Sequence, residues 1–120
     1  MKILVVDDSK AMRLLVMRAL RQIGLGGHTF VEAANGAEAL RAIHADPPDL
    51  VLADWNMPEM NGIDLLNQLR ASGDEVRFGF VTSESSPEMR DQALKAGALF
   101  LLTKPFTPET LRTALAPVLP

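Results

Sequence analysis

The chain has 120 residues, 48% of them hydrophobic, and a formal net charge of −3 from 12 basic and 15 acidic side chains. A chain of this length can bury one core and form a single domain, and the absence of a basic run disfavours direct binding to nucleic acid. Because cysteine is absent, disulfides and thiolate metal sites are excluded, and a reducing cytoplasm is the expected location.

Short hydrophobic runs predict five buried strands, separated by helical stretches. The predicted strands span residues 2–7, 28–33, 49–54, 77–82 and 98–103. The first run is far too short for a signal or membrane segment, so we expect a cytoplasmic protein with no membrane insertion. Nearly continuous hydrophobic runs are typical of parallel strands that are covered on both faces.

The clearest helical stretch follows the first strand, with Ser9 placed as its N-cap. Its predicted apolar stripe consists of Met12, Leu15, Val16, Ala19, Leu20 and Ile23. Two later helices are predicted to begin at Pro87 after Ser86 and at Pro108 after Thr107, since proline suits the first turn. The alternation of strands and helices predicts a doubly wound α/β fold, with a five-stranded parallel sheet and helices on both faces.

Polar residues able to do chemistry follow four of the five predicted strands. The first strand ends at Asp7 and Asp8, the third at Asp54, the fourth at Thr82 and the fifth runs into Lys104. Ligands of doubly wound sheets bind outside the carboxyl ends of the strands. A strand order of 2-1-3-4-5, with the second strand at an edge, would bring the other four ends into one pocket.

This set of residues suggests metal-assisted phosphoryl transfer. Three converging carboxylates, Asp7, Asp8 and Asp54, repel one another unless a cation is present. Oxygen ligands without nearby histidine or cysteine favour a hard ion, so we predict Mg²⁺. Lys104 and Thr82 add a positive charge and a hydroxyl donor, which suit the oxygens of a phosphoryl group. Asp54, alone at its strand end, is the candidate nucleophile.

The residues resemble the receiver-domain signature of response regulators. The resemblance is carried by the acidic pair in VVDDS, the run Asp54-Trp55-Asn56-Met57-Pro58, the strand end Val81-Thr82-Ser83 and the segment Lys104-Pro105-Phe106. It covers the whole chain in order and implies one receiver domain over residues 1–120, without an output domain. Within the family, the chain is most similar to single-domain chemotaxis regulators of the CheY type, which implies a flavodoxin-like fold.

The resemblance also implies a role for each residue of the pocket. A sensor histidine kinase would phosphorylate Asp54, and Thr82 and Lys104 would contact the phosphoryl group. The metal ligands would be Asp8, Asp54 and the main-chain carbonyl of Asn56, with Asp7 acting largely through water.

A stand-alone regulator is the function that the resemblance implies, rather than an enzyme with a separate substrate. Its only expected chemistry is self-catalysed phosphorylation and dephosphorylation, the latter tuned by Asn56 and Glu84. A downstream protein would read the phosphorylated state on residues 86–117.

One position departs from the family pattern. Receiver domains usually have Tyr or Phe three residues before the lysine, whereas this chain has Leu101. Phe100 is adjacent, but side chains alternate along a strand, so we expect it to face the other side of the sheet.

Two other functions share part of the pattern. A haloacid-dehalogenase-type phosphatase also uses an aspartate nucleophile and Mg²⁺, but it generally has a second aspartate two residues later, where this chain has Asn56. A receiver that acts as a phosphorylation-independent scaffold is the other alternative, and the complete acidic pocket argues against it.

Overall fold

The computed structural model describes residues 1–119 and contains one parallel sheet with the order β2-β1-β3-β4-β5. The strands are β1 (Lys2–Val6), β2 (Thr29–Ala33), β3 (Leu50–Ala53), β4 (Arg77–Thr82) and β5 (Leu101–Thr103). The predicted doubly wound α/β fold and its strand order are therefore confirmed. All the described pairs of neighbouring strands are parallel.

The fifth strand is shorter than the predicted span of residues 98–103. The cause lies at the preceding helix end, where Gly97 has a φ of 100° and the Ala98 amide donates to the carbonyl of Ala93 at 3.0 Å. Ala98 therefore closes the helix instead of joining the sheet. The Leu99 amide then reaches the Phe78 carbonyl at 2.8 Å, so pairing with β4 starts before the regular strand does.

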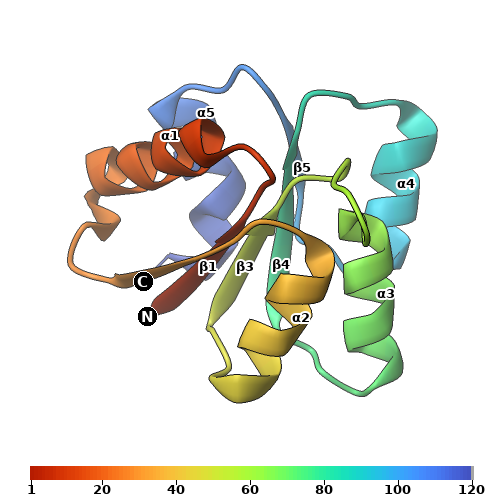
Figure 1. Cartoon of the computed structure of the whole chain (residues 1–120). Coiled ribbons are helices and arrows are strands. Elements are labelled where there is room, and N and C mark those ends of the chain that lie inside the picture. The colour runs from red at the N-terminus through yellow and green to blue at the C-terminus, as the bar shows by residue number, and fades with distance from the viewer. Residues whose placement is uncertain (120) are drawn as a thin grey trace.

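Helices cover both faces of the sheet. They are α1 (Lys10–Leu20), α2 (Gly36–Ala45), α3 (Gly62–Ala71), α4 (Pro87–Lys95) and α5 (Pro108–Leu115), with short turns η1 (Arg21–Leu25) and η2 (Ala116–Val118). Figure 1 shows α1 and α5 on one face and α2, α3 and α4 on the other. The predicted caps Ser9, Ser86 and Thr107 are confirmed, because each side chain accepts a backbone N–H three residues later.

The sheet divides the hydrophobic core into two layers. Along β1, Leu4 and Val6 pack toward α2, α3 and α4, whereas Ile3 and Val5 pack toward α1 and α5. Both sets are almost fully buried. This explains the nearly continuous hydrophobic strands, since a strand between two helical layers has no solvent-facing side.

The predicted apolar stripe of α1 is wrong at one position. Leu15 is 52% exposed, whereas Met17, which lay outside the predicted stripe, is 5% exposed and packs into the core. Leu15 instead lines a surface groove of about 270 Å³, together with Phe106 and Pro108 from the segment that leads into α5. The helix is therefore rotated slightly from the face that the apolar spacing suggests.

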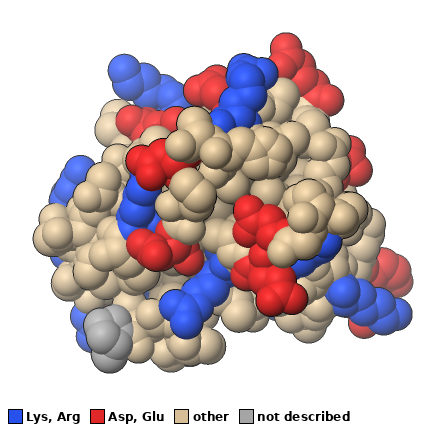
Figure 2. Space-filling model, turned by 90° about the horizontal axis from the view of Figure 1, so that it is seen from below, with Lys and Arg blue, Asp and Glu red and all other residues tan. Residues whose placement is uncertain are grey.

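Charges of both signs are interspersed on the face where the strands begin, which lies at the lower side of Figure 1 and faces the viewer in Figure 2. Near the start of β1, the Lys2 ammonium pairs with Asp46, and the Lys2 amide donates to Asp49 at 2.7 Å. These contacts tie β1 to the loop between α2 and β3. Within residues 1–119, each helix is too short or too polar to cross a lipid bilayer.

Candidate functional site

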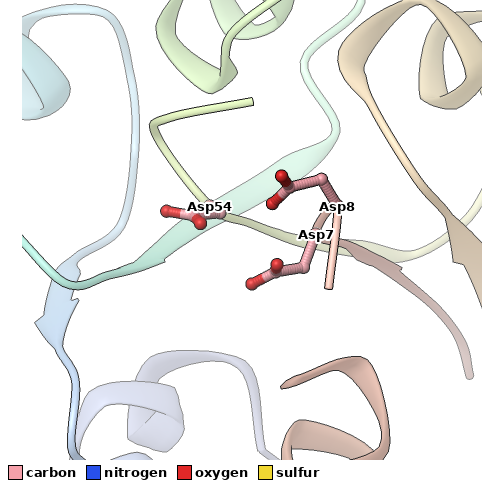
Figure 3. Close-up of side chains that lie close together, drawn as sticks. All are labelled: Asp7, Asp8 and Asp54. Atoms are coloured by element: carbon pink, nitrogen blue, oxygen red, sulfur yellow. The ribbon is translucent and has the colours of Figure 1, made fainter. Parts of the chain in front are cut away.

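Three acidic residues meet where β1 and β3 end. The two strands are neighbours, with Val6 opposite Ala53, and the Asp54 amide donates to the Val6 carbonyl at 2.9 Å. One carboxylate oxygen from each of Asp7, Asp8 and Asp54 lies within 4.8 Å of the others, and Figure 3 shows the three groups close together. The structure thus brings together all three acids that the sequence singled out.

Lys104 extends into this cluster from the end of β5. Its Nζ lies 2.9 Å from Asp7 Oδ2 and 3.3 Å from Asp54 Oδ2, while its main-chain amide donates to the Thr82 carbonyl at 2.7 Å. Thr82 is the fully buried last residue of β4. The ends of β1, β3, β4 and β5 therefore share one site, as the strand order predicted.

The two carboxylates determine the charge state of Lys104. Burial alone lowers the pKa of Lys104, but the hydrogen bond to Asp7 and the negative charges of Asp54 and Asp7 outweigh it and raise the pKa above its ordinary value. The ammonium therefore stays protonated at neutral pH. It supplies a fixed positive charge beside Asp54.

Two buried polar atoms of the site lack partners. Asp54 Oδ1 and Thr82 Oγ1 make no hydrogen bond within residues 1–119. A buried polar atom left unsatisfied costs about 1–3 kcal/mol, so such atoms mark a place where water, an ion or a ligand is bound. Both atoms belong to residues on neighbouring strand ends, β3 and β4. A reacting group that bonds to both would remove this cost.

The donor set fits Mg²⁺. The cluster offers oxygen atoms of three carboxylates, with Asp7 and Asp54 buried and Asp8 exposed. Two oxygens on opposite sides of one Mg²⁺ are about 4.2 Å apart, twice the metal–oxygen bond, so the cluster has the size of a single partly hydrated ion. Exposure of Asp8 leaves the entrance open to solvent.

The loop after Asp54 is held closely against the sheet. Trp55 is 8% exposed and its ring lies 4.9 Å from that of Phe80. The Gly62 amide donates to the Trp55 carbonyl at 2.8 Å, and a Cβ at Gly62 would lie 2.2 Å from the Asp54 main-chain oxygen. Only glycine lets α3 begin this close to Asp54. Asn56 lies in the same loop with its side chain exposed.

The structure also shows the surroundings of Leu101. Its side chain is 4% exposed and packs in the core layer under α4. Phe100 belongs to the opposite layer, where its ring covers Gly79, so the predicted orientation of Phe100 is confirmed. Arg90 of α4 donates to the Leu101 carbonyl at 3.1 Å. Leu101 is thus already inside the protein and has no aromatic ring to turn inward.

Sequence reasoning missed two charged residues at the edge of the site. Arg13 of α1 donates to the main-chain carbonyl of Asp7 at 2.6 Å and to Glu32 of β2 at 2.9 Å. The apolar periodicity of a helix assigns its charged residues to the exposed face, so it could not predict the inward position of Arg13. The signal in the sequence was weak: an arginine one turn into the first helix and an acid near the end of an edge strand.

Comparison with known proteins agrees with this architecture. Residues 3–116 match the response regulator receiver domain. The chain belongs to this family. Members are phosphoacceptor proteins of two-component signalling, and receiver domains generally bind Mg²⁺.

Several chemotaxis proteins resemble the whole chain. It is 41% identical over 122 residues to chemotaxis protein CheY1 of Helicobacter pylori strain J99, which covers 99% of this chain and 97% of that protein. It is 40% identical to a CheY homologue of Campylobacter jejuni, over 99% of this chain and 92% of that protein. The solved structure of CheY4 from Vibrio cholerae superposes with a TM-score of 0.84 at 35% identity, covering 98% of each chain.

Proposed function

We propose that this receiver accepts a phosphoryl group on Asp54 from a sensor histidine kinase and thereby changes its affinity for a downstream protein. The observation that carries the proposal is that two buried atoms at neighbouring strand ends, Asp54 Oδ1 and Thr82 Oγ1, have no partner in residues 1–119, while the Lys104 ammonium lies 3.3 Å from Asp54 Oδ2. A nucleophile, a neutral donor and a cation thus belong to neighbouring strand ends at one edge of the sheet. These are the parts that phosphoryl transfer requires.

In the proposed reaction, an Asp54 carboxylate oxygen attacks the phosphorus atom of a phosphohistidine. A phosphorus–oxygen bond forms, the phosphorus–nitrogen bond breaks, and the departing imidazole nitrogen takes up a proton. The product is a carboxyl phosphate on Asp54. Hydrolysis of this carboxyl phosphate by water returns the carboxylate and releases inorganic phosphate. We therefore expect no substrate other than the phosphodonor and water.

Asp8, Asp54 and the main-chain carbonyl of Asn56 would hold Mg²⁺ directly, with Asp7 acting through water. Bound there, the ion would supply positive charge to the phosphoryl oxygens. The all-oxygen donor set of the acidic cluster supports this assignment.

Thr82 and Lys104 would bind the other phosphoryl oxygens. The Thr82 hydroxyl is buried without a partner among the described residues and could donate to an incoming oxygen. Lys104 is bonded to both Asp7 and Asp54, so its ammonium would exchange a contact with Asp54 for one with the phosphoryl group. Asn56 and Glu84, both exposed near the site, would tune the attack of water during dephosphorylation.

The likeness to chemotaxis proteins supports a chemotaxis-type role in the cytoplasm for this receiver. The histidine kinase would supply the phosphoryl group, and a target protein would bind residues 86–117, which contain α4, β5 and α5. Membership of the receiver family supports this function over the phosphatase alternative.

Incubation with acetyl phosphate tests the proposal, with and without Mg²⁺, followed by intact mass and Trp55 fluorescence. Trp55 is the single tryptophan, and it adjoins Asp54. We expect a labile phosphoryl adduct that requires both Mg²⁺ and Asp54. Asp54→Asn should abolish the adduct, whereas Asp91→Asn, which changes an exposed carboxylate paired with Lys95, should not. Absence of any adduct on the native protein would favour the phosphorylation-independent scaffold.

A further inference from the structure

Arg13 is directed inward from a helix whose other basic residues are exposed. Its side chain is 13% exposed, whereas Lys10, Arg18 and Arg21 lie on the solvent side of α1 and η1. A long cationic side chain is rarely buried unless it is paired. Its partners, the Asp7 carbonyl and the Glu32 carboxylate, therefore indicate a specific task at the edge of the site.

Arg13 completes a set of bonds that fixes Asp7. The Asp7 amide donates to the Ala33 carbonyl at 3.1 Å, and its two carboxylate oxygens accept from the Ser9 amide and from Lys104, both at 2.9 Å. The remaining group, the Asp7 carbonyl, accepts from Arg13 at 2.6 Å. Every polar group of Asp7 thus has a partner in the structure.

The bond from Arg13 acts on the following residue. The Asp7 carbonyl belongs to the peptide plane that joins Asp7 to Asp8, and a peptide unit is close to planar. Fixing that carbonyl therefore fixes the direction in which the Asp8 backbone leaves the sheet. Asp8 is exposed, so the surrounding protein constrains its carboxylate less than that of Asp7. Together with the bond from the Ser9 amide to Asp7 Oδ1, the orientation of this peptide plane determines where the Asp8 side chain begins.

Glu32 holds Arg13 in place and offsets its charge. Glu32 lies opposite Val5 in the β1–β2 register, next to the strand end that carries Asp7. It accepts from Arg13 Nε, while Nη1 of the same guanidinium bonds to Asp7. Only a planar guanidinium reaches two acceptors in this fixed arrangement. An unpaired cation here would repel a metal ion, and Glu32 reduces that repulsion.

We propose that Arg13, held by Glu32, is a positioning residue that directs the Asp8 carboxylate and thereby sets the affinity for Mg²⁺. The inference rests on the proposed Mg²⁺-dependent function of this site. It assigns a role to the first helix and the edge strand, neither of which contributes a ligand.

Positioning and simple electrostatics predict opposite results. If Arg13 acts only as a nearby positive charge, Arg13→Met should tighten Mg²⁺ binding, and Arg13→Lys should leave it unchanged. If Arg13 positions Asp8, both variants should weaken binding, because a lysine ammonium cannot reproduce the two-pronged contact. The sign of the change therefore separates the two explanations.

The test is titration of each metal-free protein with Mg²⁺, followed by Trp55 fluorescence. We expect the dissociation constant to rise about tenfold in both Arg13 variants, at the low end for residues that orient metal ligands. Arg21→Met is the matched control, since it removes the same charge from a residue that lies over Phe30 away from the site. The control should change the constant less than twofold.

A second measurement needs no metal. Nitrogen-15 relaxation of the metal-free protein should show greater mobility of the Asp8 and Ser9 amides in Arg13→Lys, with the amides of α3 unchanged. General loosening of the fold would instead change α3 as well and would overturn the inference. This measurement still decides the matter if Arg13→Met fails to fold.

The outcomes separate this inference from the function on which it rests. If the native protein does not bind Mg²⁺, both are overturned. If the native protein binds Mg²⁺ but the Arg13 variants bind within twofold of it, or Arg13→Met binds more tightly, only the positioning role is overturned. Weaker binding in both variants with an unchanged control supports the positioning role.

Discussion

Asp7 and Asp54 lie side by side at the ends of neighbouring strands, yet their surroundings differ. Asp7 has partners for its amide, its carbonyl and both carboxylate oxygens. Asp54 and its neighbour Thr82 each leave a buried oxygen without a partner in residues 1–119. The Asp7 side of the pocket, here called the fixed frame, therefore has all its hydrogen bonds. The side formed by Asp54 and Thr82, here called the reacting half, has oxygens that a further group could bond.

Lys104 joins the two halves, since its ammonium contacts both Asp7 and Asp54. Its bond to Asp7 would keep it in place during the proposed exchange of its contact with Asp54. The frame therefore positions a cation that the reacting half uses. Changes to the frame should alter binding or folding, and changes to the reacting half should alter chemistry.

The largest expected effect is that of Lys104→Met on phosphorylation. Removing one preorganised donor from a reacting oxygen typically slows a reaction about 100-fold or more, and we expect a loss of that size in the rate of adduct formation with acetyl phosphate. Mg²⁺ should still bind, because the acidic cluster is intact. Lys95→Met, at an exposed lysine of α4, is the control. An unchanged rate in Lys104→Met would remove the lysine from the mechanism.

A second substitution tests how closely the Asp54 loop is held. Gly62→Ala would place a Cβ 2.2 Å from the Asp54 main-chain oxygen, so the backbone must move. We expect the free energy of unfolding in urea to fall by about 2 kcal/mol, as for other overpacked sites. At Gly27 a Cβ would meet nothing within 4 Å, so Gly27→Ala should change the value by less than about 0.5 kcal/mol. Equal effects would contradict the close approach.

Thr82→Val should separate stability from function. The change removes the unpartnered buried hydroxyl while keeping a similar shape, so the unphosphorylated protein should gain about 1 kcal/mol of stability. Adduct formation should nevertheless slow, because a donor to the phosphoryl group is lost. Urea unfolding and the acetyl phosphate assay measure the two effects. A stability loss combined with normal phosphorylation would show that the hydroxyl is structural.

The smallest expected effect is on the pH dependence of stability. Because folding raises the pKa of Lys104, the stability that this contributes is fully present below the unfolded-state value of about 10.4 and is lost as the pH rises through the folded value. Unfolding free energies of the native protein and of Lys104→Met should therefore differ by a constant amount from pH 7 to 9. Their difference should shrink only above about pH 10.4. Convergence near pH 8 would contradict the raised pKa.

The sheet and its reactive edge could be predicted because they depend on simple patterns. Hydrophobic runs mark strands between two layers, and the residues that follow four such strands meet at one edge. The start of β5 and the exposure of Leu15 could not be predicted, because they depend on how Ala98 closes a helix and on the rotation of α1. Arg13 was missed because hydrophobic periodicity cannot distinguish a charged residue that turns inward from one that points to solvent.

The absence of partners for Asp54 Oδ1 and Thr82 Oγ1 could not be seen in the sequence either. Whether a buried oxygen is satisfied depends on contacts between strands that are far apart along the chain, as between β3 and β4. The sequence predicted which residue types meet. It could not predict which of their atoms remain free to react.

Localisation of the phosphoryl group tests the central claim most directly. The native protein is treated with acetyl phosphate and Mg²⁺, reduced with borohydride to convert a carboxyl phosphate into an alcohol, and digested for peptide mass analysis. We predict homoserine at position 54, with Asp7 and Asp8 unmodified, because only Asp54 combines a free buried oxygen with a neighbouring donor and cation. Homoserine at position 7 or 8, or none at 54, would contradict the division of the pocket into a fixed frame and a reacting half.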